Sequence, residues 1–397
     1  MSILLVHRHY FPDSPPYASI IKDMREMQIF RDGCIDVLAS QPSYKFEDKF
    51  KSIAWKVKDD LGTVRRLPVF RFNNQKVNKM LNFFWFPFIS FWAMLFGKKY
   101  KAAIVSTAPP VLLAFGIALA CKIRGIKLVY HCMDIHPEIG RITGDFKNKW
   151  IFNFLIKLDH FTCRVASRIV VLSGDMKHSL TQRDSALKNK IEIINNYNLG
   201  DNQLEEQNFF NQNDGKFRIV FAGNIGCFQN LDIMITALSN VSNKANLQLI
   251  FVGEGAALNQ LKNLTKELKL QEFVRFIPHQ PLEVAKKIIK DSQIAIISLH
   301  EKVIRYAYPS KTMTYLSLGV PILALVENES ELAKTIINHN LGFVCPPKDV
   351  KNLSNVISNL ENKIQLIEKT NIQKYFRRTF PKSEFQLKFL HLLKDIL

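Results

Sequence analysis

The chain has 397 residues, of which 47% are hydrophobic and 22% are charged, and its formal net charge is +19 at pH 7. This composition excludes a disordered or fibrous protein, and the length is sufficient for two or three domains that each bury a core. The charge indicates an anionic partner, but composition alone leaves nucleic acid, a membrane surface and a phosphorylated substrate open.

In the first half of the chain, short apolar runs alternate with longer helical patterns. We expect strands at 3–6, 103–105, 127–130, 169–172 and 191–194, with helices that include 111–124 and 150–164. This alternation predicts a parallel sheet that is covered by helices on both faces.

The uncharged segment 81–97 interrupts this pattern, and eight of its seventeen residues are aromatic. Lysines flank it on both sides, and residues 51–101 hold 11 basic and 2 acidic side chains. The run is short for a spanning helix and contains Pro87, so we favour attachment to an anionic membrane surface over a buried or a spanning helix. Within the membrane-associating segment 76–101, the expected contacts are Phe83, Phe84, Trp85, Phe88, Phe91, Trp92, Lys98 and Lys99.

Residues 195–216 are rich in Asn, Gln, Asp and Gly and are predicted to be a linker. A second series follows, with strands expected at 217–222, 247–252, 273–277, 293–298 and 321–326, and the chain ends in a helical pattern. The predicted fold class is α/β, with two Rossmann-like doubly wound domains facing a central cleft. The domains are expected at 1–200 and 201–380, followed by a C-terminal helix at 381–397.

Two glycine-rich turns follow expected strands of the second half. Gly223, Asn224 and Gly226 lie in the first turn, where backbone N–H groups can bind a phosphate. Glu254 lies between two glycines in the second turn and can accept hydrogen bonds from a hydroxylated ligand. Taken singly, each segment is equally typical of an ordinary turn between a strand and a helix.

A third segment combines Ser310 and Lys311 at the expected start of a helix. Ser310 suits a helix cap, and Gly319 suits the helix end. Lys311 then lies in the first turn, where the helix dipole disfavours a cation and a bound anion would offset that conflict. Lys311 is therefore a candidate phosphate ligand, and its alternative role is that of a solvated surface lysine.

Together, the motifs AGNIG-x-x-Q-x-LD, VGEG and PSK-x-x-x-YLSLG-x-P resemble the family 4 retaining glycosyltransferases, which have the GT-B fold. Within that family, they are similar to the bacterial O-antigen and capsule polysaccharide subgroup. Residues 10–19 occupy the place of the family's small-residue loop, and 134–138 resemble its Asp-x-Trp-Pro-Glu segment. The resemblance covers nearly the whole chain.

The resemblance implies roles for individual residues. It makes Asp134 and Lys311 catalytic, although a helix cap is the alternative role of Asp134. The implied donor site consists of Gly223, Asn224, Gly226, Glu254, Arg305, Ser310, Lys311 and Thr314, and the implied acceptor site includes Ala18, Ser19 and His136.

The chain departs from the family at four positions. Tyr306 and Thr314 replace two common glutamates, while Asn224 and Gln229 replace a common Arg and Lys. The positive charge for the donor diphosphate is therefore expected from Lys311 and Arg305.

The resemblance also implies the reaction. The first domain would bind the acceptor and the second the nucleotide sugar, with UDP more strongly expected than GDP and with no cofactor or metal. The sugar would pass to a polyprenyl-diphosphate-linked oligosaccharide in O-antigen or capsule synthesis, on the inner face of the cell membrane. Two alternatives stay open, namely a nucleotide-sugar epimerase of the same fold and a catalytically silent membrane-associated scaffold.

The distribution of charge indicates which partner to expect, and the cysteines indicate the compartment. Residues 1–200 carry a net charge of +14 and residues 201–397 carry +5, so most of the excess belongs to the half with the aromatic segment. No helix-turn-helix, zinc or RNA-platform pattern is present, and nucleic acid is therefore not an expected partner. The six scattered cysteines, with Cys34 beside an apolar run, are expected to be reduced core residues of a cytoplasmic protein.

Overall fold

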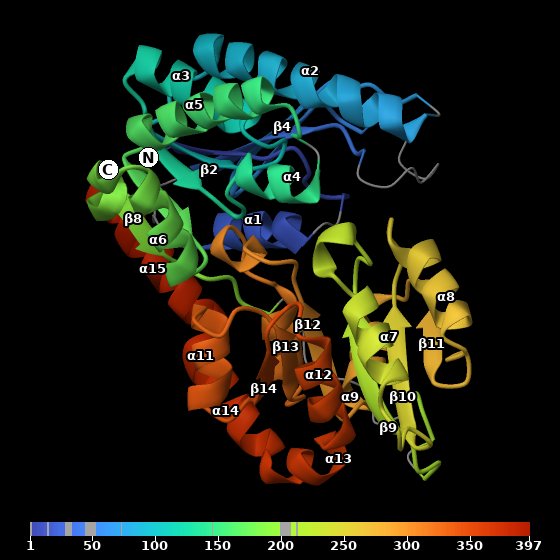
Figure 1. Cartoon of the computed structure of the whole chain (residues 1–397). Coiled ribbons are helices and arrows are strands. Elements are labelled where there is room, and N and C mark those ends of the chain that lie inside the picture. Colours follow the sequence, from blue (N-terminus) through green and yellow to red (C-terminus); the bar gives the residue numbers. More distant parts are fainter. Residues whose placement is uncertain are drawn as a thin grey trace. The chain divides into compact units, whose positions relative to one another are not determined.

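The computed structural model describes residues 2–13, 16–27, 34–43, 53–72, 74–144, 146–198, 208–211 and 213–397. The chain divides into two compact units (Figure 1). Unit 1 comprises Met1–Asn195 and Ser383–Leu397, and unit 2 comprises Asn196–Lys382. Much of the predicted linker, at 199–207 and 212, lies outside the described residues.

Among the described residues of unit 1, eight strands form one sheet in the order β3-β4-β2-β1-β5-β6-β7-β8. The pairs are parallel except for β3 and β4. Central strands such as β5 are buried along their whole length, which is typical of a sheet covered on both faces. The strands are β1 (Ser2–Val6), β2 (Cys34–Ser40), β3 (Lys56–Asp59), β4 (Gly62–Leu67), β5 (Ala102–Ser106), β6 (Lys127–His131), β7 (Arg168–Val171) and β8 (Ile191–Ile193).

The helices of unit 1 form layers against this sheet (Figure 1). Helix α3 packs against both α2 and α5. Helices α2 and α5 are preceded by the capping residues Asn74 and Asn148, whose side chains accept hydrogen bonds from free backbone N–H groups of the first turn. The helices are α1 (Pro16–Glu26), α2 (Gln75–Phe96), α3 (Leu112–Arg124), α4 (Glu138–Thr143), α5 (Lys149–Val165), α6 (Gly174–Arg183) and α15 (Lys382–Ile396), with a 3₁₀ turn at Ser185–Lys190.

Unit 2 contains a fully parallel sheet in the order β11-β10-β9-β12-β13-β14. Its strands are β9 (Phe217–Ala222), β10 (Leu247–Val252), β11 (Val274–Ile277), β12 (Ile294–Ser298), β13 (Ile322–Leu325) and β14 (Gly342–Cys345). Its helices are α7 (Asp232–Ser239), α8 (Leu258–Glu267), α9 (Leu282–Lys290), α10 (Lys311–Ser317), α11 (Glu331–Asn338), α12 (Val350–Ser358), α13 (Leu360–Lys363) and α14 (Lys369–Thr379), and 3₁₀ turns lie at Cys227–Gln229, Val303–Arg305 and Ile364–Leu366.

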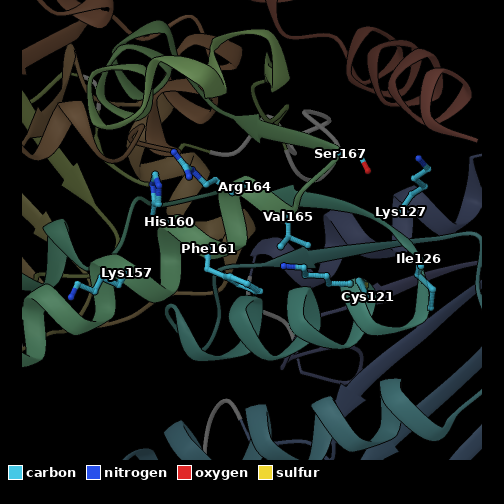
Figure 2. A pocket seen from close by; sticks show the side chains of 11 residues that line it. Cys121, Ile126, Lys127, Lys157, His160, Phe161, Arg164, Val165 and Ser167 are labelled. Carbon is cyan, nitrogen blue, oxygen red and sulfur yellow. The ribbon is translucent and has the colours of Figure 1, made fainter.

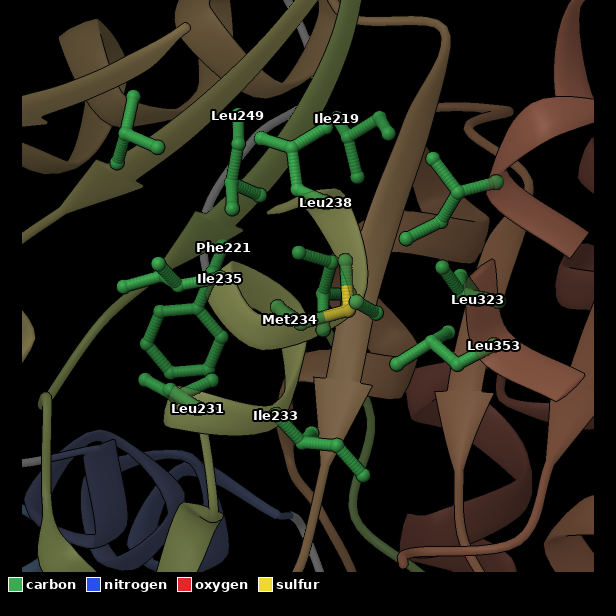
Figure 3. Close-up of a cluster of buried hydrophobic side chains, with 14 of the residues drawn as sticks. Ile219, Phe221, Leu231, Ile233, Met234, Ile235, Leu238, Leu249, Leu323 and Leu353 are labelled. Atoms are coloured by element: carbon green, nitrogen blue, oxygen red, sulfur yellow. The ribbon is translucent and has the colours of Figure 1, made fainter. Parts of the chain in front are cut away.

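The core of unit 2 supports the end of β9 (Figure 3). Apolar side chains of α7, including Met234 and Leu238, pack on Ile219 and Phe221 of β9 and on Leu249 of β10. Full burial of each such side chain contributes roughly 1.5–3 kcal/mol to folding. The turn after β9 therefore follows a strand whose side chains are fixed by core packing.

Each sheet has a switch point, where successive crossovers run in opposite directions. In unit 1, β1 lies between β2 and β5, and in unit 2, β9 lies between β10 and β12. In open parallel sheets, ligands bind beside the carboxyl ends of the strands at this point. The segments after β1, β5 and β6 and after β9, β10 and β12 are therefore where functional side chains are expected.

The predicted α/β class with two Rossmann-like sheets is confirmed, and every strand expected from the sequence is present. Strand β2 was missed because Asp36 interrupts its apolar run. In the structure, the buried Asp36 carboxylate accepts hydrogen bonds from Thr63 N, Lys98 Nζ and Tyr100 Oη at 2.7, 3.2 and 3.0 Å. These partners compensate for the burial of the charge.

The prediction of core cysteines is wrong for Cys34, which is exposed at the start of β2, and for Cys227, which is exposed after the first glycine turn. The other four cysteines are buried, and all six are free thiols. Position at the first residue of a strand leaves the Cys34 side chain outside the core.

Candidate functional site

The two predicted glycine-rich turns of unit 2 pack against each other. Gly223 N donates to Val252 O at 2.8 Å, and Ile225 N donates to Glu254 O at 2.8 Å. The φ angles of Gly223 and Gly253 are +128° and +133°, in the region that favours glycine. A Cβ atom at Gly253 would lie 2.1 Å from Gly223 O, so this contact admits only glycine.

This packing uses the backbone groups that were expected to bind phosphate. Gly223 N and Ile225 N donate to the second turn, and Gly226 N donates to Gln229 Oε1 at 3.2 Å. The expectation that the N–H groups of Gly223 and Gly226 face a ligand is therefore wrong in this structure. The N–H of Asn224 has no partner among the described residues.

Gln229, where the resembled family commonly has a lysine, supports the first turn. It is 4% exposed, and its side chain closes the turn through Gly226 N. This role explains a buried neutral amide at the position, because a lysine would leave its charge without a partner there. The side chains of Asn224 and Glu254, by contrast, are exposed.

Lys311 is the first residue of α10, and its side chain lies directly over the first glycine turn. A Cβ atom at Gly223 would be 2.7 Å from Lys311 Cε and 3.3 Å from Nζ. The Nζ atom is 4.6 Å from the ring centroid of Phe221 and has no carboxylate partner among the described residues. Burial lowers the pKa of Lys311 to about 8. A half-buried ammonium without a counter-charge is suited to bind an anion.

The predicted helix start is correct, but the predicted cap is wrong. Ser310 has helical backbone angles and no side-chain bond to a free N–H group. Instead, Thr312 Oγ1 donates to Pro309 O at 2.7 Å. The helix ends as expected near Gly319, whose φ angle is +70°.

The other predicted donor residues lie on or just before α10. Thr314 is half-buried one turn after Lys311, and Tyr306 is half-buried before the helix. Arg305 is about half exposed, and its Nη2 lies 3.8 Å from Glu329 Oε1, which is itself exposed. Within the described ranges, Lys311 therefore has no carboxylate partner, whereas Arg305 has a distant one in Glu329.

In unit 1, Asp134 follows the carboxyl end of β6. Its carboxylate is half-buried, and burial raises its pKa to about 6. Helix α4 is preceded by Pro137 and starts at Glu138, so the alternative role of Asp134 as its cap is wrong. His136 is half-buried in the same segment.

Glu138 completes this segment but has a structural partner. Its Oε1 accepts a hydrogen bond from Arg183 Nη2 at 2.5 Å, and Arg183 also pairs with the buried Asp159. Tyr130 Oη donates to the same aspartate at 2.8 Å. This network joins β6, α4, α5 and α6.

Sequence reasoning missed a buried polar cluster at the carboxyl ends of β1, β5 and β6. His7 Nδ1 pairs with Ser106 Oγ, and Tyr17 Oη lies 2.6 Å from His131 Nδ1. Burial lowers the pKa of His7 and lowers that of His131 to about 3, so both rings are neutral. Its members are far apart in the chain and form no local motif.

The predicted acceptor residues Ala18 and Ser19 of α1 directly follow Tyr17, a member of this cluster, in the sequence. Ala18 is fully buried, so its methyl group contacts the core, whereas Ser19 is half-buried. Ser14 and Pro15 of the preceding loop lie outside the described residues.

The aromatic segment forms one continuous helix, α2, with two faces. Asn82, Phe86, Ser90 and Met94 are at most 1% exposed and follow an i, i+4 spacing. On the other side, an exposed stripe follows the same spacing, and we call it the α2 stripe: Met80, Phe84, Phe88, Trp92 and Phe96, which are 42–77% exposed. Of the other predicted membrane residues, Phe83, Trp85 and Phe91 are half-buried, while Lys98 and Lys99 are exposed.

Within the described residues, Lys76–Phe96 is the one helix that is long and apolar enough to cross a membrane by length and composition alone. Such a match is weak support for a span. Packing of α2 against α3 buries one side of the helix in unit 1.

A pocket of about 610 Å³ lies between α3 and α5 (Figure 2). Its lining includes Ile126 and Lys127, where β6 begins, and Ser167, just before β7. This is the amino edge of the sheet, opposite the edge that carries Asp134. Two of its basic side chains, His160 and Arg164, face Asp184 at 3.5 and 2.9 Å. The pocket is therefore separate from the candidate site.

Known proteins resemble this chain in sequence and in fold. Residues 202–379 match the family model described as Glycosyl transferases group 1. Over 282 residues, the chain is 26% identical to the probable glycosyltransferase WbjE of Pseudomonas aeruginosa, covering 68% of this chain and 70% of that protein.

Solved structures share the fold over the full length. The structure of Anabaena HepE in complex with UDP has a TM-score of 0.69 at 14% identity, with 100% of both chains covered. Sucrose-phosphate synthase from Thermosynechococcus elongatus has a TM-score of 0.75 at 12% identity, covering 100% of this chain and 98% of that one. WaaG, described as involved in lipopolysaccharide biosynthesis, has a TM-score of 0.65 at 12% identity, covering 98% and 99%. The chain is thus a glycosyltransferase with the GT-B fold, and its residues 202–379 match the glycosyl transferases group 1 domain.

Proposed function

We propose that this glycosyltransferase is a family 4 enzyme that transfers a sugar, with retention, from a UDP-sugar to a polyprenyl-diphosphate-linked oligosaccharide. The observation that carries the proposal is the ammonium of Lys311, which lies over Gly223 and pairs with no carboxylate in the part of the chain that the structure describes. The UDP bound to HepE supports the donor class, and the involvement of WaaG in lipopolysaccharide biosynthesis supports the O-antigen or capsule setting.

In this proposal, the donor diphosphate lies against the glycine turns, where the absence of side chains allows close approach. Lys311 Nζ stabilises the negative charge that develops on the departing phosphate oxygen. The bond from the anomeric carbon to that oxygen breaks while the acceptor hydroxyl oxygen bonds to the same face of the sugar. The acceptor proton passes to the departing phosphate, and the Asp134 carboxylate orients the acceptor hydroxyl.

The direct test is a ligand-observed NMR screen of UDP- and GDP-sugars, followed by transfer of the bound sugar to a polyprenyl-diphosphate acceptor. We expect binding of a UDP-sugar and a product whose anomeric configuration equals that of the donor. Conversion of the nucleotide sugar to an epimer without acceptor would show the alternative epimerase activity. Absence of nucleotide-sugar binding would support the other alternative, a catalytically silent scaffold. That alternative arises because Tyr306 and Thr314 replace two glutamates that are common in the family.

The two shifted pKa values predict a bell-shaped pH profile of kcat/KM. Burial raises the pKa of Asp134 to about 6 and lowers that of Lys311 to about 8. The proposed roles need the carboxylate ionised and the ammonium protonated, so kcat/KM falls below pH 6 and above pH 8. In initial-rate profiles of the residual activity, Asp134→Asn should remove the acidic limb and Lys311→Met the alkaline limb. Limbs that stay unchanged in both variants contradict these roles.

We also propose that the enzyme is cytoplasmic and binds the inner face of the cell membrane through the α2 stripe. Five exposed aromatic or apolar side chains on one side of a helix are unusual in a protein that faces only water. Exposed lysines lie near both ends of the stripe, including Lys76, Lys79, Lys98 and Lys99, and the helix contains no acidic residue. Apolar insertion combined with flanking cations suits an anionic bilayer.

A further inference from the structure

Three arginines lie near the carboxyl edge of the unit 1 sheet, outside the site described above. Arg8 follows β1, Arg66 is the penultimate residue of β4, and Arg71 lies in the segment after β4. Arg66 Nη2 donates to Phe11 O at 2.9 Å, and Arg71 Nη2 lies 3.5 Å from Gln41 Oε1. These contacts connect the segments that follow β1, β2 and β4.

Arg8 differs from the other two because its guanidinium makes no hydrogen bond to any residue in the described ranges. Its Nε atom and that of Arg66 are both buried without a hydrogen-bond partner in the described part of the chain. Arg8 and Arg71 are half-buried, while Arg66 is 9% exposed. Guanidinium donors that are withdrawn from water without acceptors are costly unless a ligand supplies the acceptors.

The charge of this arginine cluster is only partly compensated. Burial lowers the pKa of all three guanidinium groups, and Asp13 is the carboxylate whose charge opposes that effect at each of them. The Asp13 carboxylate already accepts hydrogen bonds from Ser43 N, at 3.0 and 3.1 Å, and its Oδ2 lies 2.9 Å from His9 Nδ1. Three guanidinium groups around one carboxylate have a net positive charge, which a bound anion would neutralise.

The cluster is joined to the first half of α2. The side chain of Asn82 bonds both Phe70 N and Phe70 O, at 2.9 and 2.8 Å. Trp85 Nε1 donates to Pro68 O at 3.1 Å, and Asn78 Oδ1 accepts from Phe72 N at 2.6 Å. The segment 68–72, which carries Arg71, is therefore held against the helix that bears the α2 stripe.

From this arrangement, we propose that Arg8, Arg66 and Arg71 bind the phosphate or diphosphate group of a lipid that lies in the membrane beside the α2 stripe. The inference rests on the proposed function, in which that lipid is the polyprenyl-diphosphate acceptor. Arginine suits this ligand because its planar fork of N–H donors matches two phosphate oxygens at once. The apolar α2 stripe matches the hydrocarbon chain of such a lipid, and the half-buried arginine cluster matches its anionic phosphate group.

Vesicle binding by the full chain tests this inference. Phosphatidylcholine vesicles would carry either a polyprenyl diphosphate or the uncharged polyprenol at the same mole fraction. We expect the wild-type chain to prefer the diphosphate vesicles, and Arg8→Gln and Arg71→Gln each to weaken that preference about tenfold. Binding to the polyprenol vesicles should not change. Arg66 is left intact because its side chain also bonds a backbone carbonyl.

The matched control is Lys127→Gln with Lys157→Gln, which removes the same charge from exposed positions of the pocket in Figure 2. The control should keep the full preference. The inference is overturned if the double arginine variant, which combines Arg8→Gln with Arg71→Gln, keeps the preference, or if the control loses it equally. It is also overturned if soluble inorganic pyrophosphate binds the wild-type chain as tightly as the diphosphate vesicles do, because the site would then take a free anion.

Transfer assays separate this inference from the proposed function. If the wild-type chain transfers sugar and the double arginine variant shows an unchanged KM for the lipid acceptor, the arginine site fails while the function stands. If the chain prefers diphosphate vesicles in an arginine-dependent way but binds no nucleotide sugar, the function fails while the site stands.

Discussion

Replacement of Lys311 by methionine is expected to lower kcat by about 100- to 1,000-fold. The Lys311 ammonium lies over Gly223, and the proposed function assigns to it the stabilisation of charge on the departing diphosphate. Methionine keeps an apolar stem over the turn and removes only the charge. A sugar-transfer assay with radiolabelled donor measures the effect, because it detects turnover far below the wild-type rate.

The Lys311→Met variant should stay folded, since it also removes an ammonium whose burial is unfavourable. A thermal unfolding midpoint equal to or above that of the wild-type chain would confirm this. The control is Lys334→Met, which removes an exposed lysine of α11 in the same unit and should keep full activity. Full activity of Lys311→Met would rule out the assigned role.

Introduction of glutamate at Phe84, Phe88 and Trp92 is expected to weaken binding to anionic vesicles by about 100-fold or more. These side chains are 62, 55 and 42% exposed on the α2 stripe. Each large apolar side chain that is fully buried in the bilayer contributes roughly 1.5–3 kcal/mol to the free energy of membrane binding, and the substitution removes this contribution. In addition, anionic lipid repels the added negative charge. Cosedimentation with vesicles that contain phosphatidylglycerol measures the change.

The control for the α2 stripe is Leu366→Glu, which places one glutamate at an exposed apolar position of unit 2, where the side chain is 74% exposed. This variant should bind vesicles as the wild-type chain does. Because the three stripe residues are exposed, the triple variant should retain its circular dichroism spectrum and its affinity for the UDP-sugar. Unchanged cosedimentation of the folded triple variant would remove the membrane proposal.

Residues that act through local patterns were predictable from the sequence. The ten predicted strands depend on runs of apolar residues and the end of α10 depends on a single glycine, and each signal lies within a few positions of its effect. The predicted Ser310 cap failed because the sequence does not reveal whether the residue before a helix has extended or helical backbone angles. Strand β2 was missed because Asp36 is tolerated only through partners in β4 and after α2.

Residues that act through distant contacts were not predictable. Arg8 and Arg71 are neighbours of the same carboxylate, yet no motif links them in the sequence. His7 meets Ser106 because β1 and β5 are adjacent in the sheet, and Tyr17 of α1 meets His131 at the end of β6 although 114 positions separate them. Strand order depends on the packing of the whole sheet, and a single sequence carries no local signal for it.

The sequence by itself determined the alternation of strands and helices, the glycine turns, the candidate Lys311 and an aromatic segment flanked by lysines, because these depend on composition and spacing along the chain. Only the tertiary structure decided that the N–H groups of Gly223, Ile225 and Gly226 are bonded within the protein, and that Lys311 lies over Gly223 with no carboxylate partner among the described residues. It also decided which aromatic residues of α2 face solvent and which arginines share one acidic neighbour. These properties depend on which groups are brought together and withdrawn from water, and that is settled by packing between segments that are far apart in the chain.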